Sequence, residues 1–177
     1  MNGKLIPFKF HPRVFNSLGA DLVTDDIVAL IELVKNSYDA GADKVNISFF
    51  NDENEKLTLE ICDNGCGMTR EVIKDVWFTV ATPFKENNKS IIIDNTKRKV
   101  SGEKGLGRLS TARLGELLEV YTKTKNDGCW KITLNWSEIT DSNTAGGIIE
   151  KSTFPYPNYD SGTTSRIKSL YEDWLEN

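Results

Sequence analysis

The stretch ALIELVKNSYDAGADKV, residues 29–45, carries the pattern from which the fold is inferred. Glu32, Asn36 and Asp39 are spaced four and three residues apart in it. On an α-helix this spacing places the three side chains within roughly 60° of one another. A row of carboxylate, amide and carboxylate suits either a solvated helix face or a binding site. Taken alone, the helix favours the solvated face.

Local signals define the limits of this helix. Thr24 or Asp25 can cap its start, and Gly41 can end it. We expect its buried face to lie opposite the polar row. That apolar stripe consists of Ile27, Leu30, Ile31 and Val34.

The rest of the chain predicts strands and short helices. Strands are expected at 44–51, 56–63, 117–125, 129–136, 146–154 and 163–170. Helices are expected at 69–78, capped by Thr69, at 107–116, and at 171–177, where the sequence stops within the pattern. Residues 80–104 have weak periodicity and predict a long loop. This order predicts an α/β (α+β) two-layer sandwich, with a mixed, mostly antiparallel sheet and helices on one face.

Composition indicates an ordinary globular domain. The 177 residues are 38% hydrophobic and carry a net charge of −4, which argues against a dedicated nucleic-acid surface. We expect the basic run at 97–99 to be solvated. No apolar run reaches the roughly 20 residues that span a membrane. Three cysteines and His11 do not favour zinc, and a cytoplasmic location is the expectation.

Two glycine-rich segments suggest a nucleotide site. DNGCGM, residues 63–68, follows a predicted strand, and a tight turn and a ligand loop fit it about equally well. Asp63 there can accept a hydrogen bond from an exocyclic amine such as that of adenine. GEKGLG, residues 102–107, opens a helix, where free N–H groups and Lys104 suit phosphate. Its spacing is not that of a Walker A loop.

The order of these motifs is more specific than any one of them. The chain runs E-x-x-x-N-x-x-D, D-x-G-x-G, a long loop, G-x-K-G-x-G, and then G-T at 162–163. This set resembles the GHKL ATPases, which include DNA gyrase B, the ninety-kilodalton heat-shock chaperones, sensor histidine kinases and MutL proteins. The resemblance covers residues 15–170 and is closest to the MutL and chaperone branches. It implies the Bergerat fold, with a long ATP lid.

The resemblance also implies roles for individual residues. Glu32 would be the general base, Asn36 would bind Mg²⁺, and Asp39 would lie beside the nucleotide. Asp63 would bind the adenine amine with support from Thr163. The adenine pocket would be shaped by Gly65, Gly67 and Met68. The lid would open at Thr82 and Lys85, and the phosphates would contact Lys104, Gly105, Leu106 and Gly107.

The implied activity is Mg²⁺-dependent ATP binding and hydrolysis that drives a conformational or dimerisation switch. We expect one domain over residues 1–177, the N-terminal fragment of a longer protein with a downstream transducer or effector domain. An ATP-dependent homodimer is expected, without a nucleic-acid or membrane partner. Two alternatives stay open: the catalytic domain of a histidine kinase, and a nucleotide-binding module without turnover. Cys66 is expected to be a small pocket residue rather than a reactive thiol.

Overall fold

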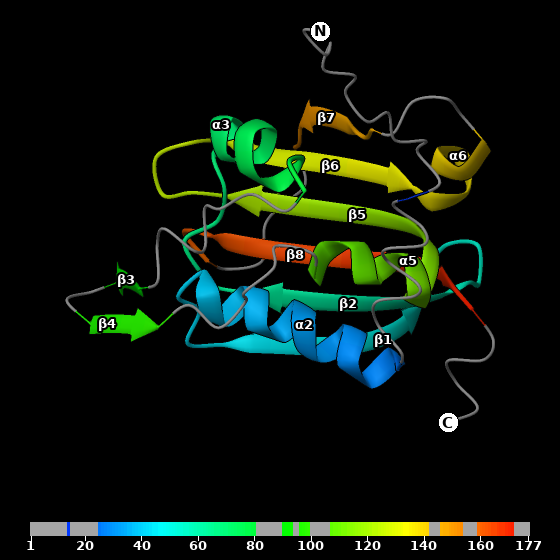
Figure 1. The fold of residues 1–177 in the computed structure, drawn as a ribbon, viewed down its shortest axis with the longest axis horizontal. Helices are drawn as coiled ribbons and strands as arrows, with labels where there is room; N and C mark the ends of the chain where they lie inside the picture. Colours follow the sequence, from blue (N-terminus) through cyan, green and yellow to red (C-terminus); the bar gives the residue numbers. More distant parts are fainter. Residues whose placement is uncertain are drawn as a thin grey trace, which may run out of the picture.

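A six-stranded sheet forms one layer of the molecule in the computed structural model, which describes Val14 and residues 25–80, 90–93, 96–99, 107–141, 146–153 and 159–171. Its strands are β1 (Val45–Asn51), β2 (Leu57–Asp63), β5 (Gly115–Lys123), β6 (Cys129–Asn135), β7 (Ile148–Lys151) and β8 (Gly162–Leu170). They lie in the order β1-β2-β8-β5-β6-β7, and every neighbouring pair is antiparallel (Figure 1). The predicted two-layer fold is confirmed, with an antiparallel sheet where a mixed one was allowed.

Helices form the second layer, on the face of the sheet turned to the viewer in Figure 1. They are α2 (Asp26–Asp39), α3 (Arg70–Val72), the π-helix η1 (Ile73–Trp77), the 3-10 helix η2 (Gly107–Ser110), α5 (Thr111–Leu114) and α6 (Trp136–Asp141). The core between the layers is aliphatic and aromatic, with Leu59, Leu118, Ile132 and Ile167 almost completely buried. None of the described helices combines the length and apolar character that crossing a membrane requires.

Helix α2 has the predicted limits. Asp25 caps it by accepting a hydrogen bond from the Ile27 N–H at 2.7 Å. The helix ends where Gly41 takes a left-handed φ of 80°, a conformation that glycine adopts at little cost. Both ends were therefore readable from local sequence.

The buried face of α2 was predicted only in part. Ile27 and Ile31 are 64% and 46% exposed, whereas Ala29, Leu33 and Ser37 are buried. The helix packs on the sheet and also beside η2 and α5, so the face that carries Ala29, Leu33 and Ser37 points inward. Of the predicted stripe, Ile27 and Ile31 remain outside, whereas Leu30 is partly buried and packs against the core.

Three other expectations are corrected. The segment 80–104 is not a plain loop, because β3 (Ser90–Ile93) and β4 (Thr96–Lys99) pair within it as an antiparallel hairpin. The helix expected over 107–116 is a 3-10 turn followed by one short α-helix, because Gly115 already belongs to β5. Helix α6 was missed, since its sequence continues a strand-like run. The helix expected at 171–177 lies outside the described residues beyond position 171.

The sheet face away from the helices carries an ion cluster. Glu119 is 7% exposed and lies between Lys131 and Lys168, whose ammonium groups are 2.7 and 2.8 Å from its two oxygens. The Arg166 guanidinium bonds Glu60 at 2.6 Å on the neighbouring strands. Burial of Glu119 opposes its ionisation, but the two lysines outweigh burial and lower the pKa of this carboxyl.

We expect Glu119→Gln to lower the free energy of unfolding by roughly 2 kcal/mol at neutral pH, because it leaves two half-buried ammonium groups without their anion. The folded pKa is depressed, so the stabilisation is present above the usual glutamate value of about 4.3 and is lost as the pH falls through the folded pKa. Urea unfolding at pH 7 and at low pH measures the difference. Glu116→Gln, at an exposed position of the same strand, is the matched control. Equal losses at both pH values would contradict the prediction.

Candidate functional site

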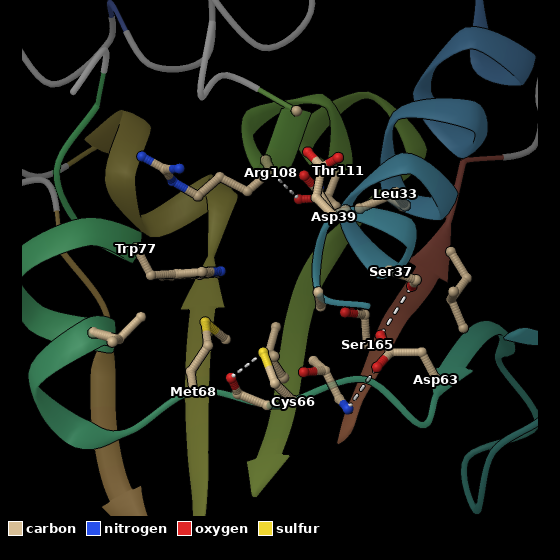
Figure 2. Close-up of a pocket in the computed structure, with 18 of the residues that line it drawn as sticks. Leu33, Ser37, Asp39, Asp63, Cys66, Met68, Trp77, Arg108, Thr111 and Ser165 are labelled. Atoms are coloured by element: carbon tan, nitrogen blue, oxygen red, sulfur yellow. Dashed lines mark hydrogen bonds between the residues drawn. The ribbon is translucent and has the colours of Figure 1, made fainter. Parts of the chain in front are cut away.

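A cavity of about 270 Å³ lies between α2, η1, η2 and the sheet. Figure 2 shows side chains from all of these elements turned toward it. The predicted residues that line it are Asn36, Asp39, Asp63, Gly67, Met68, Gly107 and Thr163. Apolar side chains such as Ile61, Trp77 and Val120 form much of the remaining wall. The site therefore has an apolar wall and a polar end, the combination typical of a small-molecule pocket.

Asp63 is fixed at the base of the cavity, where β2 ends. One carboxylate oxygen accepts the N–H groups of Gly65 at 2.9 Å and Thr163 at 3.1 Å. The other accepts the Ser37 hydroxyl at 2.9 Å. These donors come from three elements, α2, the loop after β2 and β8, so the orientation of the carboxylate depends on the assembled fold.

The environment of Asp63 acts on its charge in two directions. The residue is 5% exposed, and burial raises the pKa of its carboxyl because the ionised form loses water. The three hydrogen bonds lower the pKa, yet burial prevails. A buried acceptor with a raised pKa that lines a cavity is a candidate ligand contact.

The Asn64–Gly67 loop is held tightly against its surroundings. The Cys66 N–H donates to the Ala40 carbonyl at 2.8 Å, and the Asn64 side-chain oxygen accepts the N–H groups of Asp43 and Lys44. A Cβ on Gly65 would lie 2.8 Å from the Ala40 carbonyl oxygen. This segment is therefore both the turn and the cavity wall that its sequence allowed.

Gly67→Ala is expected to lower the free energy of unfolding by more than about 2 kcal/mol. Gly67 has a φ of 67°, and an added Cβ would lie 1.9 Å from the Lys123 carbonyl oxygen, so backbone must move. Urea denaturation measures the loss. Gly128→Ala is the control, because a Cβ there meets nothing within 4 Å. Equal stability of the two variants would show that the loop relaxes freely.

A threonine network joins the loop to β5 and β8. The Thr122 hydroxyl oxygen accepts the Met68 N–H at 2.8 Å and lies 3.1 Å from the Thr163 hydroxyl. Thr163 in turn donates its backbone N–H to Asp63. Thr163 is thus part of the Asp63 network, and Thr122 fixes the backbone of Met68.

The other end of the cavity brings the polar row of α2 against η2. A Cβ built on Gly107 would lie 3.4 Å from both the Asn36 amide nitrogen and one Glu32 carboxylate oxygen. The other Glu32 oxygen accepts a hydrogen bond from Lys35 at 2.7 Å, and this bond is the main cause of the raised pKa of Lys35. Glycine at position 107 leaves space beside the carboxylate and the amide. Asn36 and Asp39 therefore line the cavity and Glu32 lies beside Gly107, so the polar row is not simply a solvated face.

Part of the predicted site is outside the described residues. Thr82, Lys85, Lys104, Gly105 and Leu106 all fall between positions 80 and 107, where only β3 and β4 are described. Their predicted lid and phosphate contacts stay predictions. Across the described ranges, no group of three or more His, Cys, Asp or Glu side chains is placed to hold a metal ion.

Sequence reasoning missed several residues of the site. Ser37 bonds Asp63, and Trp77, Arg108 and Thr111 line the cavity. The local signal for Ser37 is weak, a single serine on the packed face of an amphipathic helix. Its partner is 26 residues away, so only the fold reveals the contact.

Cys66 is an exposed residue of the cavity wall, and its thiol contacts the Gly67 carbonyl oxygen at 3.4 Å. Partial burial, and secondarily the charge of Asp63, raise the pKa of this thiol. Little of it is thiolate at neutral pH, as expected for a pocket-wall residue.

Residues 25–163 match the family described as histidine kinase-, DNA gyrase B-, and HSP90-like ATPase. The chain belongs to this ATPase family. The match covers the polar row of α2, the Asp63 loop, Gly107 and Thr163, and it ends at the strand that donates to Asp63. A domain of this GHKL family is an ATP-binding domain. From the motifs that define the resemblance, the cavity described above is lined by Asn36, Asp39, Asp63, Gly67, Met68, Gly107 and Thr163.

The chain is similar in sequence to DNA mismatch repair proteins and to a putative restriction enzyme. The chain is 28% identical over 165 residues to the DNA mismatch repair protein MutL of Anaplasma phagocytophilum, covering 93% of this chain and 25% of that protein. It is 32% identical over 117 residues to MutL of Rippkaea orientalis, covering 66% and 19%. It is 29% identical over 113 residues to the putative type II restriction enzyme HgiDII of Herpetosiphon aurantiacus, covering 64% and 17%. The chain thus spans a quarter or less of the length of these relatives.

Proposed function

We propose that this domain binds ATP in the cavity, hydrolyses it with the help of Mg²⁺, and uses the cycle to switch the conformation or dimerisation of the protein that contains it. The proposal rests on the environment of Asp63. This residue is a buried carboxylate held by three donors at the base of an apolar-walled cavity within a family that binds ATP.

The adenine end of the site is assigned to Asp63 and its network. An exocyclic amine is a donor, and a buried carboxylate oriented by Ser37, Gly65 and Thr163 is a strong acceptor for it. Ile61, Met68 and Val120 supply apolar contact for the rings. Gly67 has a left-handed φ of 67°, which glycine adopts without steric cost. Because it has no side chain, its backbone would be able to approach the adenine closely.

The phosphate end is assigned to α2 and η2. The space over Gly107 lies next to Glu32 and Asn36, so a terminal phosphate there would have a carboxylate and an amide within reach. Glu32 would orient the attacking water and accept its proton. Asp39 lies on the same row and would contact the nucleotide. The predicted phosphate contacts of Lys104, Gly105 and Leu106 belong to this end.

The donor set is compatible with Mg²⁺. Magnesium is commonly held by one or two protein oxygens together with substrate phosphates and water, so an all-protein cage is not required. The Asn36 amide beside Gly107 fits this pattern. Bound there, the ion would neutralise charge on the phosphates during transfer to water.

The switch function rests on the relatives. Two of them are mismatch repair proteins about four times the length of the matched segment or more, so the ATP-binding domain is a part of a larger protein there. We extend this organisation to the present chain, with an ATP-dependent homodimer and a downstream effector domain. The similarity to two MutL proteins and a putative restriction enzyme favours a process that acts on DNA over the histidine kinase alternative.

Calorimetric titration with ATP and ADP, with and without Mg²⁺, tests the binding part. We expect the protein to bind both nucleotides, with Mg²⁺ strengthening the binding of ATP. A phosphate-release assay on the intact protein tests turnover. Binding without any turnover would support the alternative of a module that binds but does not hydrolyse. Absence of binding would overturn the proposal.

A further inference from the structure

Arg108 is the one basic side chain among the described residues that line the cavity, and the family resemblance gave it no role. It follows Gly107 directly, at the end of the site where Glu32 and Asn36 lie. Figure 2 shows its side chain crossing the cavity toward Trp77 and away from Asp39. It also lines a smaller neighbouring cavity of about 70 Å³ beside Phe78 and Val80.

The guanidinium is held in place by two contacts. One of its terminal nitrogens donates to the Thr79 carbonyl oxygen at 2.8 Å. Its central carbon lies 5.9 Å from the centre of the Trp77 ring, within the range of a cation–π contact. A guanidinium has five N–H donors, so a single carbonyl uses only a small part of its capacity.

The charge of Arg108 lacks a compensating anion in the part of the chain that the structure describes. No Asp or Glu there forms an ion pair with it, although Arg113, Arg166 and Lys131 each have one. Burial lowers the pKa of Arg108 to about 10, so it is still a cation at neutral pH. Partly burying an uncompensated cation costs free energy, and a phosphate in the cavity would offset this cost.

We propose that Arg108 is a specificity-determining residue that contacts the terminal phosphate of the nucleotide and makes the site prefer ATP to ADP. The inference rests on the proposed function, because it places the terminal phosphate over Gly107. In the structure the Thr79 carbonyl and the Trp77 ring hold the guanidinium on the side of η1, and Arg108 directly follows Gly107, so a rotation of its side chain would bring the guanidinium to that phosphate. Binding of a third phosphate then draws the cation off the Trp77 ring, so that the fluorescence of Trp77 changes with ATP and not with ADP.

The test compares Arg108→Gln and Arg108→Lys with wild type in the intact protein. Dissociation constants for a non-hydrolysable ATP analogue and for ADP are measured by calorimetry. We expect Arg108→Gln to weaken binding of the analogue by about 10-fold or more while ADP changes less than about twofold, since one charge-assisted contact is lost. Arg108→Lys keeps the charge but not the planar guanidinium. Its affinity for the analogue is expected to lie between those of wild type and Arg108→Gln.

Arg113→Gln is the matched control. Arg113 lies five positions further on and pairs with Asp26 at 2.6 Å, so its loss is expected to lower the melting temperature without changing the ratio of the two affinities. Trp77→Phe is expected to remove the fluorescence response to the analogue. An unchanged ratio of affinities in Arg108→Gln would overturn the inference. If that variant does not fold, an unchanged ratio in Arg108→Lys overturns it. Failure of wild type to bind either nucleotide would instead overturn the proposed function.

Discussion

Glu32→Gln is expected to reduce ATP turnover on the order of 10²- to 10³-fold while the affinity for ATP changes less than about threefold. The amide keeps the size and polarity of the side chain but cannot accept a proton from water. Glu32 lies beside Gly107, at the other end of the site from Asp63, so nucleotide binding is expected to persist. Phosphate release and calorimetric titration of the intact protein measure the two quantities.

The ion pair with Lys35 makes this variant informative. Glu32 uses one oxygen for the Lys35 ammonium, at 2.7 Å, and the other oxygen faces Gly107. Lys35→Met removes the pair and keeps the base, so it is expected to retain most of the turnover. Glu138→Gln, on the distant α6, controls for a general effect of losing a carboxylate. Full turnover by Glu32→Gln would show that Glu32 is not the general base and would contradict the role that the family resemblance implies for it.

Asp63→Asn is expected to weaken binding of both ATP and ADP by roughly 3 kcal/mol, or about 100-fold. The carbonyl oxygen of asparagine still accepts from Gly65 and Thr163, and the Ser37 hydroxyl can rotate to accept from the new amide. The fold is therefore expected to be retained. The amide N–H₂ then replaces an acceptor in the region assigned to the adenine amine, so two donors face each other.

Calorimetry with ATP, ADP and adenosine measures this effect. All three ligands carry the amine, so all three are expected to lose affinity by a similar factor. Asp127→Asn is the control, because Asp127 also accepts hydrogen bonds but lies in the β5–β6 turn outside the cavity. A loss restricted to ATP would place Asp63 at the phosphates and contradict the assignment.

The raised pKa of Asp63 adds a dependence on pH. Recognition of the amine needs the ionised carboxylate, so affinity is expected to fall on acidification at a higher pH than an ordinary aspartate would give. For folding the sign is opposite: a raised folded pKa favours the protonated form, and this contribution to stability is lost as the pH rises through the folded pKa. Asp63→Asn therefore removes a cost of burying charge, which is consistent with a folded variant that does not bind.

Local sequence was sufficient to predict the limits of the elements that have a clear cap or a clear alternation of apolar and polar residues. The capping carboxylate of Asp25 and the left-handed Gly41 set the limits of α2, and alternating β-branched and polar residues gave β1 and β2 within a residue. The helical period alone aligned Glu32, Asn36 and Asp39. Local sequence failed at α6, whose residues continue a strand-like run, and at the hairpin of β3 and β4, which lies in a segment of weak periodicity.

The tertiary structure decided what those aligned residues face. The period of α2 is the same whether the polar row meets water or a cavity. The packing of η2 beside the helix placed Asn36 and Asp39 in the cavity wall, and Ile27 and Ile31 are exposed. The pairing of β2 with β8 brings Thr163 opposite Asp63 across 100 residues, and Ser37 reaches the same carboxylate from α2. Helix limits depend on hydrogen bonds between near neighbours, which a short stretch of sequence determines. The charge state and orientation of Asp63 depend on burial and on donors from distant segments, which exist only once the sheet and the helix layer have assembled.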